Sequence, residues 1–379
     1  MIQLLRQTKW ALGSCIGSRI IIFATILLSR MAFAAGKSGP LVGPEPKGTL
    51  LTVLNYWDGT WYRTIAQMGY FSDLLPWKGD FPLALACFPL YPLLIRLAAF
   101  LIPDFWIASV VVSNICFLVS AVLFDALIKL DYPDPKVGHR AITFLMFTPM
   151  SFFFSMAYTE STFLMLSLAA FLAARKEKWL IASLCGMCLS ATRPPGFLIA
   201  LPLFIEYLQQ WRRSEPTLRT LLRPPLFFLG LIPLGLGAYM AFCRFTRGSF
   251  FASMQAHHAG WEQKLTFPWH ALTGLDEFAP FYRWLFVGAL VLGSALFAAG
   301  FWLRIRPSYL VWIGALMAFS LSWGSMASSP RFLSIIFPLF IVLGLITARF
   351  EGVYEWLLAA SVAVLTLCTI LLANGYWMT

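Results

Sequence analysis

The sequence has few charged residues. Asp, Glu, Lys and Arg make up 12% of its 379 residues, whereas a soluble domain carries roughly 25%. Hydrophobic residues make up 59%, and the mean hydropathy is +0.75. Apolar stretches long enough for transmembrane helices recur from end to end. This composition excludes a soluble globular protein and predicts an all-α, multi-pass membrane protein that forms a single domain over residues 1–379.

Internal repeats, low-complexity tracts and nucleic-acid-binding motifs are also lacking. The lack of repeats disfavours a secondary transporter, because inverted repeats are common in transporters. The net charge of +11 comes mostly from short basic clusters between apolar stretches, which is how membrane topology is encoded. We therefore expect the lipid bilayer to be a partner and nucleic acid not to be one.

The chain shows no metal signature. Six of its seven cysteines lie in or at the ends of predicted spans, and no Asp-x-Asp motif occurs in an outer loop. Cys185-Gly-Met-Cys188 has redox-motif spacing, but within an apolar helix such cysteines are usually packing residues. We expect no metal site, no cofactor and no required disulfide.

The N-terminus imitates a signal peptide. It has an apolar run at Ile20–Leu28 followed by Ala32-Phe33-Ala34, which has the form of a cleavage site. Arg19 interrupts the apolar region and Arg30 lies just before the site. We therefore predict an uncleaved first helix in which Arg19 snorkels toward the cytoplasmic interface.

Three basic clusters determine the predicted topology. Arg175–Lys178, Arg212–Arg223 and Arg304–Arg306 are all cytoplasmic by the positive-inside rule, so an even number of spans must separate them. Parity then gives about eleven spans, with the N-terminus inside and the C-terminus outside. The predicted spans are 13–34, 105–129, 139–158, 160–174, 179–193, 196–210, 224–244, 281–303, 308–326, 331–348 and 354–373.

Two long outer loops result, at about 35–104 and 245–280. The first contains the apolar segment Phe81–Pro103. One crossing there would invert every later basic cluster, and the segment also contains several prolines. We therefore predict that Phe81–Pro103 is interfacial or re-entrant, so that the first outer loop carries interfacial helices.

Several ionisable residues share the predicted outer side, where such residues are functional candidates by default. They are Asp58, Glu160, Arg193, His257, His258 and Arg331. The topology rests on the cytoplasmic lysines and arginines alone. The location of these candidates on one side is therefore independent of the way in which the topology was inferred.

Each candidate also has a structural interpretation. Asp58 could be the N-cap of a short helix that begins at Gly59. Glu160 and Arg193 could form an ion pair between neighbouring helices, and Arg331 could anchor a helix end.

The remaining candidates are less specific. The two histidines could lie on the surface without a function. The aromatic residues Trp57, Trp61 and Tyr62 could belong to the interfacial aromatic belt.

Transfer of a sugar from a polyprenyl phosphate suits one carboxylate, several cations and a site at the membrane. Hydrolysis of an ordinary glycoside normally needs an acid, because the leaving alkoxide must be protonated. A lipid phosphate leaves as a stable anion, so one carboxylate that takes the proton from the attacking hydroxyl is enough. Arginine or histidine can stabilise the charge that grows on the phosphate.

Five motifs, in this order over residues 55–340, resemble the GPI second-mannosyltransferase (PIG-V) family, and its bacterial branch in particular, within the GT-C glycosyltransferases. They are Trp57-Asp-Gly-Thr-Trp-Tyr-Arg-Thr-Ile-Ala66 with Gly69-Tyr70, Phe88-Pro-Leu-Tyr-Pro-Leu-Leu-Ile-Arg96, Tyr158-Thr-Glu-Ser-Thr-Phe163, Thr192-Arg-Pro-Pro-Gly196, and Pro330-Arg-Phe332 with Phe337-Pro338. Pro195 stands where the family more often has Asn.

The resemblance implies a GT-C fold whose first large outer loop bears the catalytic carboxylate, which by position is Asp58. It also implies inverting transfer of mannose from a polyprenyl-phosphate donor, usually without a metal, to a lipid, glycan or protein acceptor. In a bacterium the carrier would be undecaprenyl phosphate, with the site on the periplasmic side of the inner membrane. The expected substrate-binding residues are Trp57, Trp61, Tyr62, Arg63, Tyr158, Glu160, Arg193, His257, His258 and Arg331.

The competing function is a transporter or flippase of a lipid-linked or anionic substrate. Such a protein would also need basic groups near the membrane, but its key polar residues would lie at mid-bilayer. A non-catalytic accessory subunit is a third alternative.

Overall fold

The computed structural model describes residues 8–33, 49–78, 81–213, 217, 221–273, 275–323 and 326–378. These residues are mostly helical, and the only sheet among them is a two-stranded antiparallel hairpin, so the predicted all-α fold is confirmed. Residues 35–48 of the predicted first outer loop lie outside the described ranges. The chain divides into two compact units: unit 1 comprises residues 1–87, 91–161 and 343–379, and unit 2 comprises 88–90 and 162–342.

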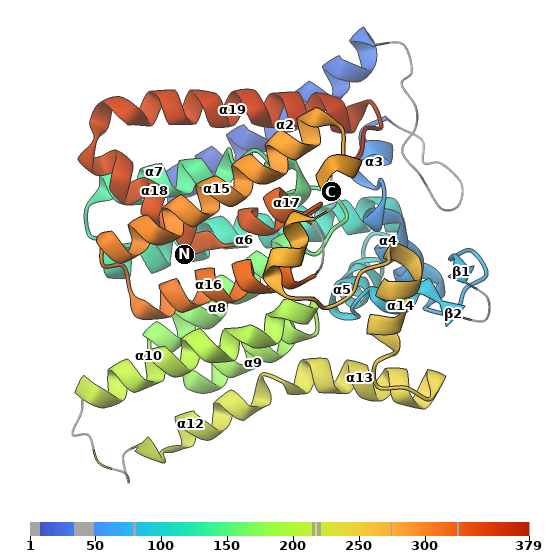
Figure 1. Ribbon diagram of the computed structural model, residues 1–379, viewed down its shortest axis with the longest axis horizontal. Coiled ribbons are helices and arrows are strands. Elements are labelled where there is room, and N and C mark those ends of the chain that lie inside the picture. The colour runs from blue at the N-terminus through green and yellow to red at the C-terminus, as the bar shows by residue number, and fades with distance from the viewer. Residues whose placement is uncertain are drawn as a thin grey trace. The chain divides into compact units, whose positions relative to one another are not determined.

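Unit 1 holds the described part of the predicted first outer loop and the helices on either side of it. Its helices are α2 (Lys9–Ala32), α3 (Thr49–Leu54), α4 (Asp58–Met68), α5 (Leu90–Ala98, apart from its first residue), α6 (Phe105–Asp131), α7 (Pro135–Met146) and α19 (Glu351–Ala373), with 3-10 helices at Leu83–Ala86 and Ser151–Phe154 and strands β1 (Trp77–Lys78) and β2 (Phe81–Pro82). Helix α2 contacts α6, α7 and α19, the last of which lies beside it although it ends the chain (Figure 1).

Arg19 on α2 does not snorkel, so that prediction is wrong. Its side chain is buried, and its guanidinium donates to the Ser151 carbonyl at 2.8 Å, to the Ser155 hydroxyl at 3.0 Å and to the Ser151 hydroxyl. It also lies 4.6 Å from the centroid of the Phe117 ring. Hydrogen bonds inside the protein thus replace the water that a snorkelling side chain would reach.

Unit 2 holds the predicted second outer loop. Its helices are α9 (Trp179–Ser190), α10 (Ala200–Arg213), α12 (Pro224–Phe228), α13 (Leu234–Arg247), α14 (Ala252–Trp261), α15 (Pro280–Trp302), α16 (Pro307–Ser322) and α17 (Ser329–Ser334), with 3-10 helices at Pro194–Ile199, Leu229–Leu231, Pro268–Leu272 and Leu275–Glu277. Helices α8 (Glu160–Arg175) and α18 (Phe337–Arg349) have residues in both units.

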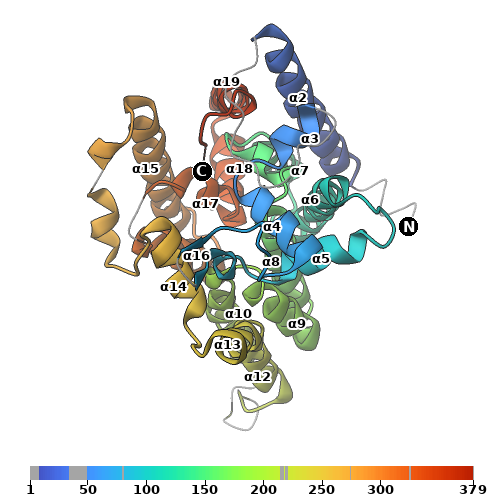
Figure 2. The same cartoon turned by 90° about the vertical axis from the view of Figure 1, so that its right-hand side faces the viewer.

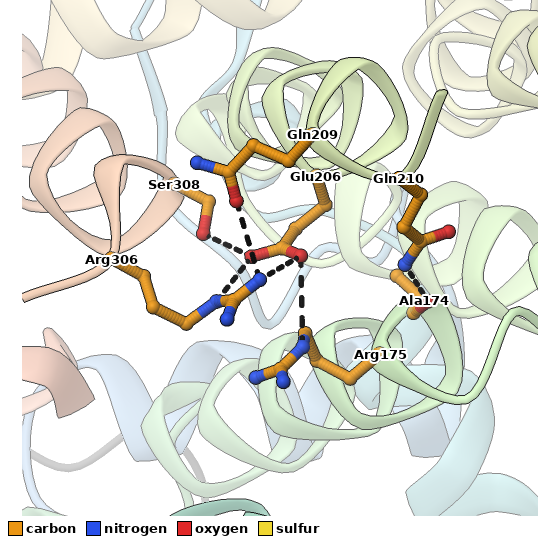
Figure 3. A network of polar contacts seen from close by, with 7 residues as sticks. All are labelled: Ala174, Arg175, Glu206, Gln209, Gln210, Arg306 and Ser308. Carbon is orange, nitrogen blue, oxygen red and sulfur yellow. Dashed lines mark hydrogen bonds and ion pairs between the residues drawn. The ribbon is translucent and has the colours of Figure 1, made fainter. Parts of the chain in front are cut away.

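A buried carboxylate joins three helices of unit 2 (Figure 3). Arg306 donates to both Glu206 oxygens, at 2.9 and 2.8 Å, and the Ser308 hydroxyl donates to one of them at 2.5 Å. Arg175 at the end of α8 adds a longer ion pair of 3.6 Å. Because the Glu206 side chain is fully buried, its charge depends on these partners.

Among the described residues, five helices are long and apolar enough to cross a membrane: α2, α6, the Pro224–Arg247 segment, α15 and α19. Some of the other predicted spans are short helices, and some are interrupted. The predicted span 139–158, for example, consists of the end of α7, a break at Pro149 and the 3-10 helix Ser151–Phe154. The protein is therefore an integral membrane protein, and the count of eleven spans stays a prediction.

The segment Phe81–Pro103 contains β2, a 3-10 turn and α5. Helix α5 has nine residues, which corresponds to about 14 Å at 1.5 Å per residue. The hydrocarbon core of a bilayer is about 30 Å thick. Helix α5 is therefore too short to cross it, in keeping with the interfacial or re-entrant segment predicted from parity.

Candidate active site

Asp58 is the first residue of α4, and a strained residue precedes it. Trp57 has φ 51° and ψ −117°, a region that L-residues rarely adopt and that costs about 1–3 kcal/mol. The next residue, Gly59, packs closely, because a Cβ there would lie 3.3 Å from the Ala157 Cβ. Strain of this kind persists only where the surrounding structure holds the backbone in place.

Contacts from the segment before α8 hold this turn. The Asp58 backbone N–H donates to the Tyr158 hydroxyl at 3.2 Å, and that hydroxyl donates to the Tyr56 carbonyl at 3.3 Å. One residue earlier, the Ala157 N–H donates to the Leu54 carbonyl at 2.8 Å. Two stretches that are about a hundred residues apart in the chain are thereby joined on both sides of Trp57.

The helix-cap interpretation of Asp58 placed the start of the helix one residue too late. Helix α4 begins at Asp58, and Trp57 occupies the N-cap position. Asp58 therefore lies in the first turn, where a carboxylate interacts favourably with the helix dipole by about 0.3–1 kcal/mol. Trp57, Asp58 and Trp61 are all partly exposed, so this end of α4 remains accessible.

Arg63, one turn further along α4, packs against α6. Its guanidinium lies 3.4 Å from the centroid of the Trp106 ring. Burial lowers the pKa of Arg63 to about 10, and the Asp104 carboxylate opposes this shift. Asp104 also caps α6, since it accepts from the N–H groups of Trp106 and Ile107. Arg63 thus stays charged at neutral pH and helps to fix α4 on α6.

Tyr62 and Glu160 come together around Tyr91 of α5. The rings of Tyr62 and Tyr91 meet edge to face at 5.4 Å, and the Tyr91 hydroxyl donates to the Ser109 carbonyl at 2.9 Å. Burial raises the pKa of Tyr91 well above its usual range, and the charge of Glu160 adds to the rise. Glu160 is fully buried at the start of α8.

Unit 2 brings two of the predicted cations together. The guanidinium carbons of Arg193 and Arg331 lie 4.7 and 5.8 Å from the centroid of the Phe332 ring. Both side chains are largely buried, at 7% and 5% exposed. Two arginines from different segments therefore lie around one aromatic ring, an arrangement typical of cation–π contacts.

Gly196 explains how the chain positions Arg193. A Cβ at Gly196 would lie 2.1 Å from the Leu189 carbonyl oxygen, so only glycine allows the 3-10 helix Pro194–Ile199 to pack this closely on the end of α9. Arg193 sits at the N-cap of that 3-10 helix. The Thr192-Arg-Pro-Pro-Gly196 motif is thus a tight turn that fixes an arginine.

The paired histidines on α14 differ from each other. His257 packs between aromatic rings, at 5.3 Å from Trp323 and 5.9 Å from Trp261. His258 is exposed. The predicted second outer loop also contacts the end of α16, because the Trp323 indole N–H donates to the Gln263 side-chain oxygen at 2.5 Å.

The structure therefore brings the predicted site residues together in two groups. Trp57, Asp58, Tyr62, Arg63, Tyr158 and Glu160 gather in unit 1 around the starts of α4 and α8, and Arg193 and Arg331 gather in unit 2 around Phe332. Sequence reasoning missed Trp106, which lies outside every motif. It also missed the contribution of Tyr91, although the motif Phe88–Arg96 contains that residue.

Part of the chain matches a known protein family. The family model described as mannosyltransferase (PIG-V) matches residues 34–192. The resemblance to this family is confirmed. The matched range includes Asp58, Tyr158 and Glu160 and ends just before Arg193. No curated protein matches the chain.

Solved structures are similar to this chain in fold. ArnT from Cupriavidus metallidurans in the apo state is 14% identical with a TM-score of 0.54, over 97% of this chain and 76% of that chain. The same enzyme bound to undecaprenyl phosphate is 15% identical with a TM-score of 0.54, over 95% and 64%. The Archaeoglobus fulgidus oligosaccharyltransferase tethered to an acceptor peptide is 12% identical with a TM-score of 0.51, over 97% and 55%.

This chain therefore spans only about half of the oligosaccharyltransferase. At these identities the likeness concerns the fold, and it confirms the predicted GT-C fold.

Proposed function

We propose that the protein is an inverting glycosyltransferase of the plasma membrane. It transfers a sugar, mannose by family, from a polyprenyl-phosphate donor to an acceptor hydroxyl on the outer face. The observation that carries this proposal is the position of Asp58, a partly exposed carboxylate at the start of α4 that is preceded by a strained residue. It lies within the range that matches the mannosyltransferase family.

Asp58 acts as the general base. It accepts the proton of the acceptor hydroxyl as that oxygen forms a bond to C1 of the sugar. The bond between C1 and the phosphate oxygen breaks on the opposite side, and its electrons leave with the polyprenyl phosphate. One displacement inverts the anomeric centre, and no acid is required because the phosphate is a stable leaving group.

Arg193 and Arg331 bind the donor phosphate. Their placement around Phe332 supports this role, because guanidinium groups form paired, charge-assisted hydrogen bonds with phosphate oxygens. ArnT, a neighbour in fold, binds undecaprenyl phosphate, which suggests a carrier of this class for the present chain.

Other predicted residues bind the sugar and the acceptor, which is a lipid, a glycan or a protein. Trp57, Trp61 and Tyr62 offer aromatic faces, and Glu160 offers a buried acceptor. His257 packs on two tryptophans and His258 is exposed, so His258 is the more accessible of the two for a ligand.

The decisive test is a donor assay on the purified protein in detergent. Polyprenyl-phosphate mannose and polyprenyl-phosphate glucose are offered separately, and released polyprenyl phosphate and transferred sugar are both measured. We expect release and transfer with mannose, and inversion at C1 by NMR. Movement of an intact donor across a vesicle bilayer, without release, would instead support the flippase alternative.

Cysteine labelling tests the predicted sides of the membrane. In a variant without its seven native cysteines, Gly260→Cys should react with an impermeant thiol reagent from outside intact cells, and Arg213→Cys should not. Gly43→Cys in the predicted first outer loop should also react from outside, although residue 43 lies outside the described residues. Labelling at 213 from outside would overturn the topology and the outer location of the site.

A further inference from the structure

The Tyr158 hydroxyl makes two hydrogen bonds that bracket one residue. It accepts from the N–H of Asp58 at 3.2 Å and donates to the carbonyl of Tyr56 at 3.3 Å. These groups belong to the peptide bonds on either side of Trp57. Their relative orientation is set by φ and ψ of Trp57 alone, so one hydroxyl that holds both groups fixes those two angles.

Trp57 needs such a constraint. Its φ of 51° makes it one of four described non-glycine residues with a positive φ, and an L-residue there tends to relax to negative φ. Rotation at Trp57 would redirect the first turn of α4, where Asp58 lies.

Tyr158 itself is firmly held. It is fully buried, its ring packs on Phe153 with centroids 5.2 Å apart, and its carbonyl accepts from the Ser113 hydroxyl at 3.4 Å. The Ala157 N–H bonds to Leu54, just before the strained turn. Helices α3 and α4, which flank that turn, both contact α6 (Figure 2).

We infer that Tyr158 is a positioning residue: its hydroxyl bridges the peptide groups flanking Trp57 and fixes the turn that presents the Asp58 carboxylate to the acceptor hydroxyl. The role in the reaction rests on the proposed function. The bridge of two hydrogen bonds from the Tyr158 hydroxyl, here called the brace, is a structural property that does not depend on that function. It gives Tyr158 a role different from the substrate binding expected from its motif.

Removal of the hydroxyl should loosen the turn without removing the aromatic ring. Tyr158→Phe removes the hydroxyl that accepts from the Asp58 N–H and donates to the Tyr56 carbonyl, so it releases the constraint on Trp57. We expect kcat to fall about 10- to 100-fold, in line with the effect of an unsatisfied buried polar group, while the donor KM changes less than twofold.

Hydrogen exchange measured by mass spectrometry tests the brace without any activity. Peptides covering residues 54–62 should exchange about 5- to 100-fold faster in Tyr158→Phe than in the unmodified protein. The matched control is Tyr207→Phe, which removes a buried tyrosine hydroxyl that donates to the Leu221 carbonyl in unit 2. That control should leave residues 54–62 unchanged. Unchanged exchange in Tyr158→Phe would overturn the brace.

A double-mutant cycle tests whether Tyr158 affects kcat through Asp58. If Tyr158 acts through Asp58, Tyr158→Phe should have no further effect on kcat in an Asp58→Asn background. Additive losses would overturn the positioning role and leave Tyr158 as a general structural residue. If the unmodified protein transfers no sugar at all, the proposed function fails, and the exchange comparison still decides whether the brace exists.

Discussion

Two carboxylates of this protein have opposite surroundings. Glu206 in unit 2 has no exposed side-chain surface and is bound by Arg306 and Ser308, with Arg175 nearby (Figure 3). Asp58 in unit 1 is partly exposed at the start of a helix. At Glu206 the protein fixes the carboxylate itself, and at Asp58 it fixes the backbone that carries the carboxylate.

This difference separates structural from chemical roles. A carboxylate whose two oxygens are both bound by an arginine inside the protein is not accessible to a substrate. A carboxylate on a rigid backbone with an accessible side chain can meet a substrate without reorganisation. The contrast predicts that changes at Glu206 affect stability and that changes at Asp58 affect rate.

Asp58→Asn should have the largest effect. Asparagine keeps the size of the side chain but cannot accept the proton, so we expect turnover to fall about 10²- to 10⁴-fold in a folded protein that still binds donor. Turnover and donor binding are measured on the purified variant. The matched control is Asp134→Asn at the N-cap of α7, because Asn and Asp cap about equally well. Near-normal turnover of Asp58→Asn would remove Asp58 from the mechanism, and Glu160 would be the next candidate.

Glu206→Gln should act on stability instead. It leaves two arginines beside a neutral amide, and loss of one partner from a buried pair costs about 3–5 kcal/mol. We expect a clear fall in Tm in detergent, while the folded fraction retains normal kcat at low temperature. A normal Tm, or a loss of kcat in fully folded protein, would contradict the separation of roles.

The sequence predicted the membrane fold and the candidate role of Asp58, but it did not predict how the backbone at Asp58 is held. Low charge and basic clusters are averaged over many residues, so the all-α membrane fold followed from composition. Asp58 was found because it lies in a motif of aromatic and small residues. The strain at Trp57 was not predictable, since a dihedral angle depends on contacts with Tyr158 about a hundred residues away.

The sequence also did not predict which charged side chains are buried. Arg19 was expected to snorkel, and Glu206 was not singled out at all. In both cases the partners come from distant segments: Ser151 and Ser155 for Arg19, and Arg306 for Glu206. The placement of Arg193 and Arg331 around Phe332 was easier to predict from the sequence, because both arginines lie in motifs on the same predicted side.

Arg193 and Arg331 allow the comparison to be extended to donor binding. Each Ala variant should raise the donor KM about 10- to 100-fold, as expected for a lost hydrogen bond between charged groups. Lys variants should recover only part of this, because a planar guanidinium binds two phosphate oxygens at once. Exposed Arg223 provides the control through Arg223→Ala. If Ala and Lys variants at both positions kept the donor KM and turnover of the unmodified protein, the two arginines would be structural.

Glu351→Gln should have the smallest effect, although Glu351 also forms an ion pair. Its side chain lies 2.5 Å from Lys136, but the two side chains are 62% and 61% exposed. Solvent and salt screen exposed pairs, and ordering two long side chains offsets the remaining attraction. We therefore expect no change in Tm beyond replicate error, measured beside Glu206→Gln in the same detergent and salt. A fall as large as that of Glu206→Gln would mean that burial does not distinguish the two pairs, and the contrast between Glu206 and Asp58 would lose its physical basis.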